Sequence, residues 1–124
     1  MQGTFLRFYV HEGHRHHRQC VWEWLLEQGN MLGIRGGSAF KAMAAFGRHH
    51  RLHEARFIEL AGTLTVEVEF VVTQDEARKL LDLLHRESLR LFYVSTPVHL
   101  GVINPDDADP PSVSESAGDF ERAP

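Results

Sequence analysis

Guanidinium and imidazole side chains are concentrated in two short stretches of this 124-residue chain. Seven of the nine histidines lie within residues 11–17 and 49–53, and both stretches contain arginine. Arginine binds anions through a planar fork of N–H donors, and histidine adds positive charge under mildly acid conditions. Imidazole nitrogen is also a ligand for Zn, Cu or Ni. The two stretches therefore indicate either an anion-binding site or a transition-metal site.

The later stretch follows a run of small residues that ends at Gly47, and we call it the 48–53 cluster. Its chemically active members are Arg48, His49, His50, Arg51 and His53. Three interpretations remain open: a solvated loop of moderate basicity, an anion site built on the two arginines, and a metal site built on His49, His50 and His53. The cluster contains no cysteine or acidic ligand, which places the metal site behind the anion site.

The earlier stretch, which we call the 12–18 cluster, combines Glu12 with the sequence His-Arg-His-His-Arg at residues 14–18. A short histidine-rich tract can bind a metal, but its spacing matches no structural zinc pattern. A solvated polar surface is the simplest interpretation of this cluster. Glu12 and Arg15 are its candidates for contact with a ligand.

Enzymatic chemistry has little support in the sequence. There is no Ser-His-Asp arrangement, no paired-carboxylate motif and no His-Glu-x-x-His helix. Cys20 stands at an expected helix start beside basic residues, which favours a thiolate, yet a small buried residue is its commoner role. Glu67 and Glu69 share the polar side of a predicted strand, so we expect them to pair with Arg7 or Lys41. We therefore expect a protein that is not an enzyme.

The composition predicts one cytoplasmic domain followed by an acidic tail. Residues 103–124 hold six of the 17 acidic residues and one of the 13 basic residues, together with many Pro and Ser residues. Residues 1–102 are therefore nearly neutral, which argues against a nucleic-acid-binding protein. The single cysteine fits a reducing compartment, and the sequence offers neither a secretory signal nor a membrane-spanning stretch. We expect residues 1–102 to fold and residues 103–124 to be disordered.

Hydrophobic periodicity places the two clusters on a small α+β domain. Alternating residues predict strands over residues 4–10, 38–46, 64–72 and 89–98. Helical spacing predicts one helix over residues 20–32, stopped by Gly33, and a second that runs from the capping box at Thr73 and Glu76 to near residue 87. This β-α-β-β-α-β order predicts a ferredoxin-like fold with a four-stranded antiparallel sheet. Two helices cover one face of such a sheet, so the other face is expected to associate with further copies.

The same residues resemble a known family. The helix that ends in Gly33-Ile34-x-Gly36, the run Ser-Ala-Phe-Lys-Ala-Met-Ala-Ala-Phe-Gly at residues 38–47, and Arg51-Leu-His53 are similar to domain of unknown function 190, a PII-like (GlnB-like) group. The resemblance covers about residues 3–99. It implies a homotrimer with clefts between subunits. It also implies a flexible loop at residues 47–62 that senses a small ligand and presents the result to a membrane transporter or an enzyme.

We therefore expect a cytoplasmic signalling protein that binds a small anionic ligand, such as a nucleotide, in a cleft between subunits. In a trimer of this fold the ends of the first two strands can face one cleft, where the two clusters would converge. The expected ligand-binding residues are Glu12, Arg15, Lys41, Gly47, Arg48, Arg51 and His53. The alternative is a metal-responsive protein of the same fold that holds a transition metal through His49, His50 and His53.

Overall fold

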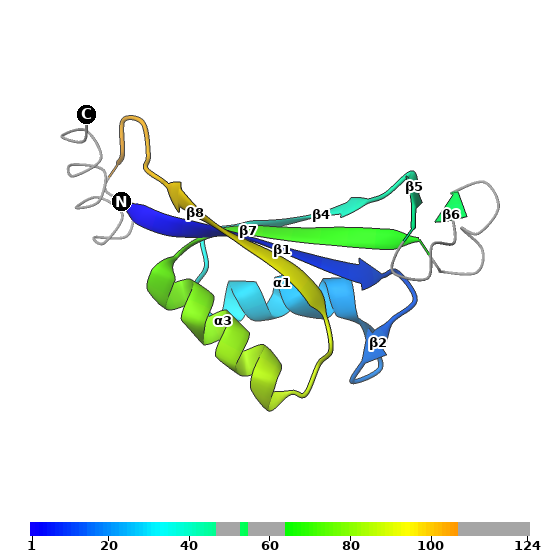
Figure 1. The fold of residues 1–124 in the computed structure, drawn as a ribbon. Coiled ribbons are helices and arrows are strands. Elements are labelled where there is room, and N and C mark those ends of the chain that lie inside the picture. The colour runs from blue at the N-terminus through cyan, green and yellow to red at the C-terminus, as the bar shows by residue number, and fades with distance from the viewer. Residues whose placement is uncertain (47–52, 55–63, 107–124) are drawn as a thin grey trace.

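The computed structural model describes residues 1–46, 53–54 and 64–106, and Figure 1 shows their arrangement as one sheet with two helices beneath it. The strands are β1 (Gln2–His11), β2 (Arg15–His16), β3 (Gln19–Cys20), β4 (Gly37–Lys41), β5 (Ala44–Ala45), β6 (His53–Glu54), β7 (Thr65–Thr73) and β8 (Phe92–His99). The helices are α1 (Val21–Met31) and α3 (Gln74–Arg86). None of the described helices is long and apolar enough to cross a bilayer.

The four long strands form an antiparallel sheet in the order β4-β7-β1-β8. The two helices connect β1 to β4 and β7 to β8, and both lie on the same face (Figure 1). This is the ferredoxin-like βαββαβ arrangement, so the predicted fold class is confirmed.

The core lies between the sheet and the helices, and in β1 and β7 it consists of the alternate residues that the hydrophobic pattern predicted to share one face. The inward-facing residues of β1 and β7 are buried: Leu6, Phe8, Val10, Val66, Val68, Phe70 and Val72. They pack against Val21, Trp24 and Leu25 of α1 and against Ala77, Leu80 and Leu84 of α3. Each such side chain contributes roughly 1.5–3 kcal/mol through its removal from water, so this layer is a large stabilising contribution to the fold.

The second predicted strand, over residues 38–46, does not continue as one strand. β4 pairs with β7 only as far as Lys41, which lies opposite Val66 near the first residue of β7. The N–H of Ala42 donates to the carbonyl of Thr65 at 2.8 Å, and beyond it β7 offers no further partner. The chain then turns, and β5 pairs with β6 as a separate two-stranded sheet. The alternation of side chains predicted extended backbone over these residues, but it could not show that the chain changes its partner strand from β7 to β6.

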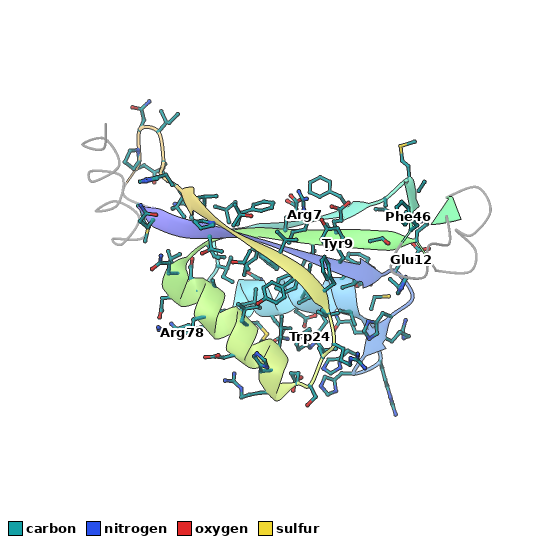
Figure 2. All side chains as sticks on the ribbon, viewed as in Figure 1. Arg7, Tyr9, Glu12, Trp24, Phe46 and Arg78 are labelled. Carbon is teal, nitrogen blue, oxygen red and sulfur yellow. The ribbon has the colours of Figure 1, made fainter. Side chains whose placement is uncertain are left out.

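No helix or strand among the described residues covers the face of the sheet away from α1 and α3, and we call it the open face. Its exposed apolar residues are Phe40 on β4, Val71 on β7, and Phe92 and Val94 on β8. Arg7 and Tyr9 of β1, labelled in Figure 2, lie on the same face, where strand pairing places them next to Glu69 and Glu67 of β7. The open face therefore has the exposed apolar side chains typical of a surface that another protein chain can cover.

Candidate functional site

A hollow on the open face lies where the sheet ends near β5. Its volume is about 390 Å³, and its lining residues are Tyr9, Ala42, Ala44, Ala45, Phe46, Thr65 and Glu67. Tyr9 and Phe46 supply aromatic walls, the three alanines let a ligand approach the backbone closely, and Thr65 and Glu67 supply polar atoms. A hollow of this size and chemistry suits a small ligand with a flat ring.

Both ends of the 48–53 cluster are attached beside this hollow. Phe46, which lines it, directly precedes the predicted binding residue Gly47. The strand residue His53 pairs with Ala45, which also lines it. Phe46 and His53, the described residues on either side of residues 48–51, therefore lie in the wall of the hollow or next to it.

The remaining predicted members of this cluster lie outside the described residues. They are Gly47, Arg48, His49, His50 and Arg51, and only the backbone of His53 is described. Their assignment to an anion site, or in the alternative to a metal site, stays a prediction.

Glu12 and Lys41, predicted as separate contacts for a ligand, form an ion pair with each other. The Nζ of Lys41 lies 3.0 Å from Oε2 of Glu12, at the ends of β4 and β1 (Figure 2 labels Glu12). The backbone N–H of Glu12 donates to Leu64 at 2.8 Å, which holds the residue at the start of β7. Lys41 lies opposite the buried Val66, so the pair projects on the helical side of the sheet. The hollow lies at the same end of the sheet but on the open face.

The second carboxylate oxygen of Glu12, Oε1, is buried and has no hydrogen-bond partner among the described residues. A buried acceptor without a donor costs roughly 1–3 kcal/mol. The geometry therefore leaves one acceptor at this sheet end that a donor from outside the described ranges, or from a ligand, can satisfy.

Arg7, Glu67 and Glu69 form a charged ladder across β1 and β7. The Nη2 atom of Arg7 lies 2.8 Å from Glu69, and its Nε lies 3.4 Å from Glu67. Hydrogen bonds with Tyr9 and with Glu69 raise the pKa of the Arg7 guanidinium above its usual value. The prediction that these two glutamates pair across the sheet is confirmed, and the partner is Arg7. Both carboxylates are engaged in ion pairs, which fits a structural role better than acid–base chemistry.

Arg15 lies in the β2–β3 hairpin, on the helical side of the sheet (Figure 1). Its Nη2 donates to the carbonyl of Arg18 at 2.6 Å, and its Nη1 lies 3.7 Å from Sγ of Cys20. Within the described ranges, these side-chain contacts all stay inside the hairpin and none reaches Glu12 or Lys41. Convergence of Arg15 with the rest of the predicted site would need the cleft of an assembly.

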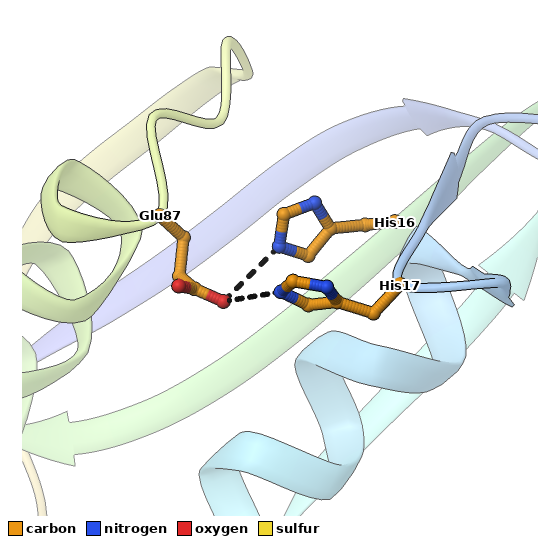
Figure 3. A group of neighbouring side chains, drawn as sticks. All are labelled: His16, His17 and Glu87. Atoms are coloured by element: carbon orange, nitrogen blue, oxygen red, sulfur yellow. Dashed lines mark hydrogen bonds and ion pairs between the residues drawn. The ribbon is translucent and has the colours of Figure 1, made fainter.

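Two histidines of the 12–18 cluster meet a residue that the sequence interpretation overlooked. Nε2 of His16 and Nε2 of His17 lie 3.1 and 2.9 Å from the same oxygen of Glu87, as Figure 3 shows. These hydrogen bonds, that of His16 first and that of His17 second, lower the pKa of the Glu87 carboxyl. Glu87 stands about 70 residues further along the chain, so no motif spacing could connect the three. The adjacent histidines at residues 16 and 17 were the only sign of this group in the sequence.

Comparison with known proteins identifies the family of this chain and one curated relative. The sequence model of the family DUF190, described as "Uncharacterized ACR, COG1993", matches residues 3–100. A UPF0166 protein of Aquifex aeolicus (strain VF5) is 23% identical over 82 residues, which cover 66% of this chain and 78% of the relative.

Solved structures with the same fold include CPII from Thiomonas intermedia K12. Its structure bound to ADP and bicarbonate is 12% identical, with a TM-score of 0.57, over 79% of this chain and 87% of that one. A second structure shows CPII, a nitrogen regulatory PII-like protein, bound to ADP, AMP and bicarbonate. It is 14% identical, with a TM-score of 0.57, over 82% of this chain and 97% of that one. The fold of this chain is therefore PII-like, as predicted.

Proposed function

Because the chain belongs to the DUF190 family and has a PII-like fold, we propose that it is a regulatory protein that binds a small anionic ligand. A nucleotide is the first candidate. The observation that carries this proposal is the hollow on the open face, because the basic 48–53 cluster is attached to its wall at both ends. The binding of ADP, AMP and bicarbonate by the PII-like protein CPII supports the same ligand class.

In this proposal the hollow holds the flat part of the ligand, and the cluster holds its charge. A ring would stack between Tyr9 and Phe46 over the alanines. Arg48 and Arg51 would bind phosphate or carboxylate oxygens through paired N–H donors, with His53 beside them. Lys41 projects on the other side of this sheet end, so it would join them only for a ligand that reaches around the end of the sheet and competes with Glu12. Oε1 of Glu12, which has no partner among the described residues, could then accept from a ligand hydroxyl or amino group.

We further propose that the protein works as a cytoplasmic homotrimer. The apolar residues of the open face support this, because a neighbouring subunit would remove them from water and would turn each hollow into an intersubunit cleft. Arg15 of the hairpin would reach the ligand only in such an assembly. Native mass spectrometry tests both parts at once, because it reports the number of subunits and any retained ligand.

The output of the proposed sensor is the segment of residues 47–62. A ligand held by Arg48, Arg51 and His53 would select one conformation of this segment, and a partner protein would recognise that conformation. A membrane transporter or an enzyme is the class of partner expected for such a regulator, while the protein itself performs no catalysis.

Titration calorimetry with ADP, AMP, phosphate and bicarbonate tests the ligand. The double variant Arg48→Ala/Arg51→Ala is expected to lose affinity at least about tenfold, because each arginine makes charge-assisted hydrogen bonds. The matched control Arg78→Ala/Lys79→Ala removes the same charge from the exposed surface of α3 and should bind as the parent does. Absence of binding by the parent protein, or equal losses in both variants, would overturn the proposal.

A further inference from the structure

Three donor atoms converge on one point between the β2–β3 hairpin and the end of α3. Nε2 of His16, Nε2 of His17 and a carboxylate oxygen of Glu87 all lie within 4.8 Å of one another (Figure 3). We propose that these three side chains form a binding site for a divalent transition-metal ion of the Zn²⁺ class. The ion would take two imidazole nitrogens and one carboxylate oxygen from the protein and would keep its remaining positions for water or an added ligand.

The backbone of the hairpin is bent so that two consecutive histidines point the same way. Consecutive residues of a strand normally direct their side chains to opposite faces, which would separate the two imidazoles. Here the two-residue turn between β2 and β3 has φ of 51° at His17 and 65° at Arg18, both left-handed. As a result the two imidazole centroids lie 4.0 Å apart.

This turn conformation is unfavourable for the residues that adopt it. Left-handed two-residue turns favour Asn and Gly, and neither is present in this one. Residues held in sparsely populated backbone conformations are concentrated at functional sites. In this conformation both imidazoles reach the same carboxylate oxygen, which is the arrangement that a bound ion would use.

Each donor is supported by contacts outside the group. His16 is largely buried and packs edge-on against Trp24 of α1, with ring centroids 4.9 Å apart. Arg15 closes the turn through its hydrogen bond to the carbonyl of Arg18. Glu87 caps α3, and its N–H donates to the carbonyl of Leu83 at 3.0 Å. The ring of His16 and the backbone of Glu87 are therefore held in place by contacts outside the group of three.

The separations of the donors suit a shared ion. Ligands bound at about 2.0–2.1 Å from one Zn²⁺ lie roughly 3 Å from each other. The two N···O separations are 3.1 and 2.9 Å, so a modest rotation of the side chains makes room for the ion. Both imidazoles form a hydrogen bond with the same oxygen of Glu87 rather than with one oxygen each, so all three donor atoms lie close together. His17 is about two-thirds exposed, which gives an ion access from solvent.

The site joins parts of the chain that are far apart in sequence. An ion would connect the hairpin that precedes α1 to the end of α3, and it would stabilise the folded state by mass action. At about a hundredfold excess of Zn²⁺ over Kd, we expect Tm to rise by about 10 °C. This site uses none of the predicted metal ligands His49, His50 and His53.

The test is Zn²⁺ titration calorimetry on the full chain without a histidine tag, together with metal analysis after dialysis. The parent protein is expected to bind one Zn²⁺ per chain through this site. His17→Ala and Glu87→Gln should each lower the affinity at least about tenfold and, at the same Zn²⁺ concentration, reduce the rise in Tm to about half or less. His17→Ala removes an exposed ligand, so its fold should persist, and far-UV circular dichroism checks this.

Two further variants separate this site from other histidines. His85→Ala removes a nearby exposed imidazole of α3 and should leave Zn²⁺ binding unchanged. The triple variant His49→Ala/His50→Ala/His53→Ala should also retain the ion. If the parent binds no Zn²⁺, or if only the triple variant loses it, the assignment to His16, His17 and Glu87 is wrong.

Discussion

Single residues of the predicted site already have partners in the subunit, and these partners decide how they can act. Lys41 is held by Glu12, and Arg15 is held by its own hairpin. An anion that uses Lys41 must therefore compete with a carboxylate 3.0 Å away. Arg48 and Arg51 carry the proposal more directly, because Phe46 before their segment lines the hollow and His53 after them pairs with Ala45 of its wall.

Replacement of Lys41 by methionine tests whether the ion pair at the sheet end stabilises the fold. Lys41→Met leaves the Glu12 carboxylate, about five-sixths buried, without its cation, so we expect the free energy of unfolding to fall by about 1–2 kcal/mol. Adding Glu12→Gln should recover part of the loss. Urea denaturation measures both effects.

The control for this prediction is Lys79→Met. Lys79 pairs with Asp75 on the exposed surface of α3, and such a pair contributes about 0.5 kcal/mol or less. Equal small losses in Lys41→Met and Lys79→Met would contradict a stabilising role for the Glu12 pair.

Residue contacts were predictable only where they follow from strand pairing. Glu67 and Glu69 alternate on one side of β7, and Arg7 lies directly opposite Glu69 on β1, so their pairing could be expected from the pattern. The contact of His16 and His17 with Glu87 could not. It depends on a left-handed turn that contains no glycine, and on a helix end about 70 residues away.

At the level of elements, local signals located the helices well and the irregular strand poorly. The predicted capping box of α3 is present: Oγ1 of Thr73 accepts from the N–H of Glu76 at 3.1 Å, and the N–H of Thr73 donates to Glu76 at 2.8 Å. Gly33, predicted as the stop of α1, has a left-handed φ of 82°. The segment of residues 38–46 was misjudged because its division into β4 and β5 depends on where β7 begins.

Loss of the capping hydroxyl should weaken α3 and the layer that packs on it. We expect Thr73→Ala to lower the free energy of unfolding by about 1 kcal/mol, because it leaves a helical N–H unsatisfied. Thr73→Ser keeps an oxygen in the same place and should restore most of the stability. Urea denaturation curves of the two variants would differ little if the capping box were unimportant.

For the whole molecule, the uncovered side of the sheet is the dominant feature. The helices bury the inward-facing residues of β1 and β7, while Phe40, Val71, Phe92 and Val94 remain exposed on the other face. The proposed trimer removes these side chains from water and surrounds the hollow. A charge on this face should therefore disrupt the assembly more than the subunit.

We expect Phe92→Glu to convert the proposed trimer to monomers, because a carboxylate at an apolar interface loses its hydration without a partner. Gln74→Glu adds the same charge to the exposed helical layer and should leave the assembly intact. Sedimentation velocity at matched concentrations measures the subunit number of both. An unchanged trimer in Phe92→Glu would place the interface elsewhere.

Removal of residues 103–124 tests the predicted division of the chain. The backbone of Leu100 exchanges hydrogen bonds with Met1 at 2.9 and 3.2 Å, which closes the described fold before the predicted tail begins. We expect the chain shortened after Val102 to keep its Tm within about 2 °C and to keep its ligand affinity, because no core residue is lost. A large drop in Tm would show that the acidic segment packs on the domain.

The amino-acid sequence alone determined the order of elements, the buried faces of β1 and β7, the ends of both helices and hence the fold class. These depend on periodicity, capping residues and glycine, which act within a few neighbouring residues. Only the tertiary structure decided that the second predicted strand divides, that Glu12 holds Lys41, and that two adjacent imidazoles meet Glu87. These contacts join distant segments, and their geometry depends on strand register and turn conformation, which no local pattern specifies.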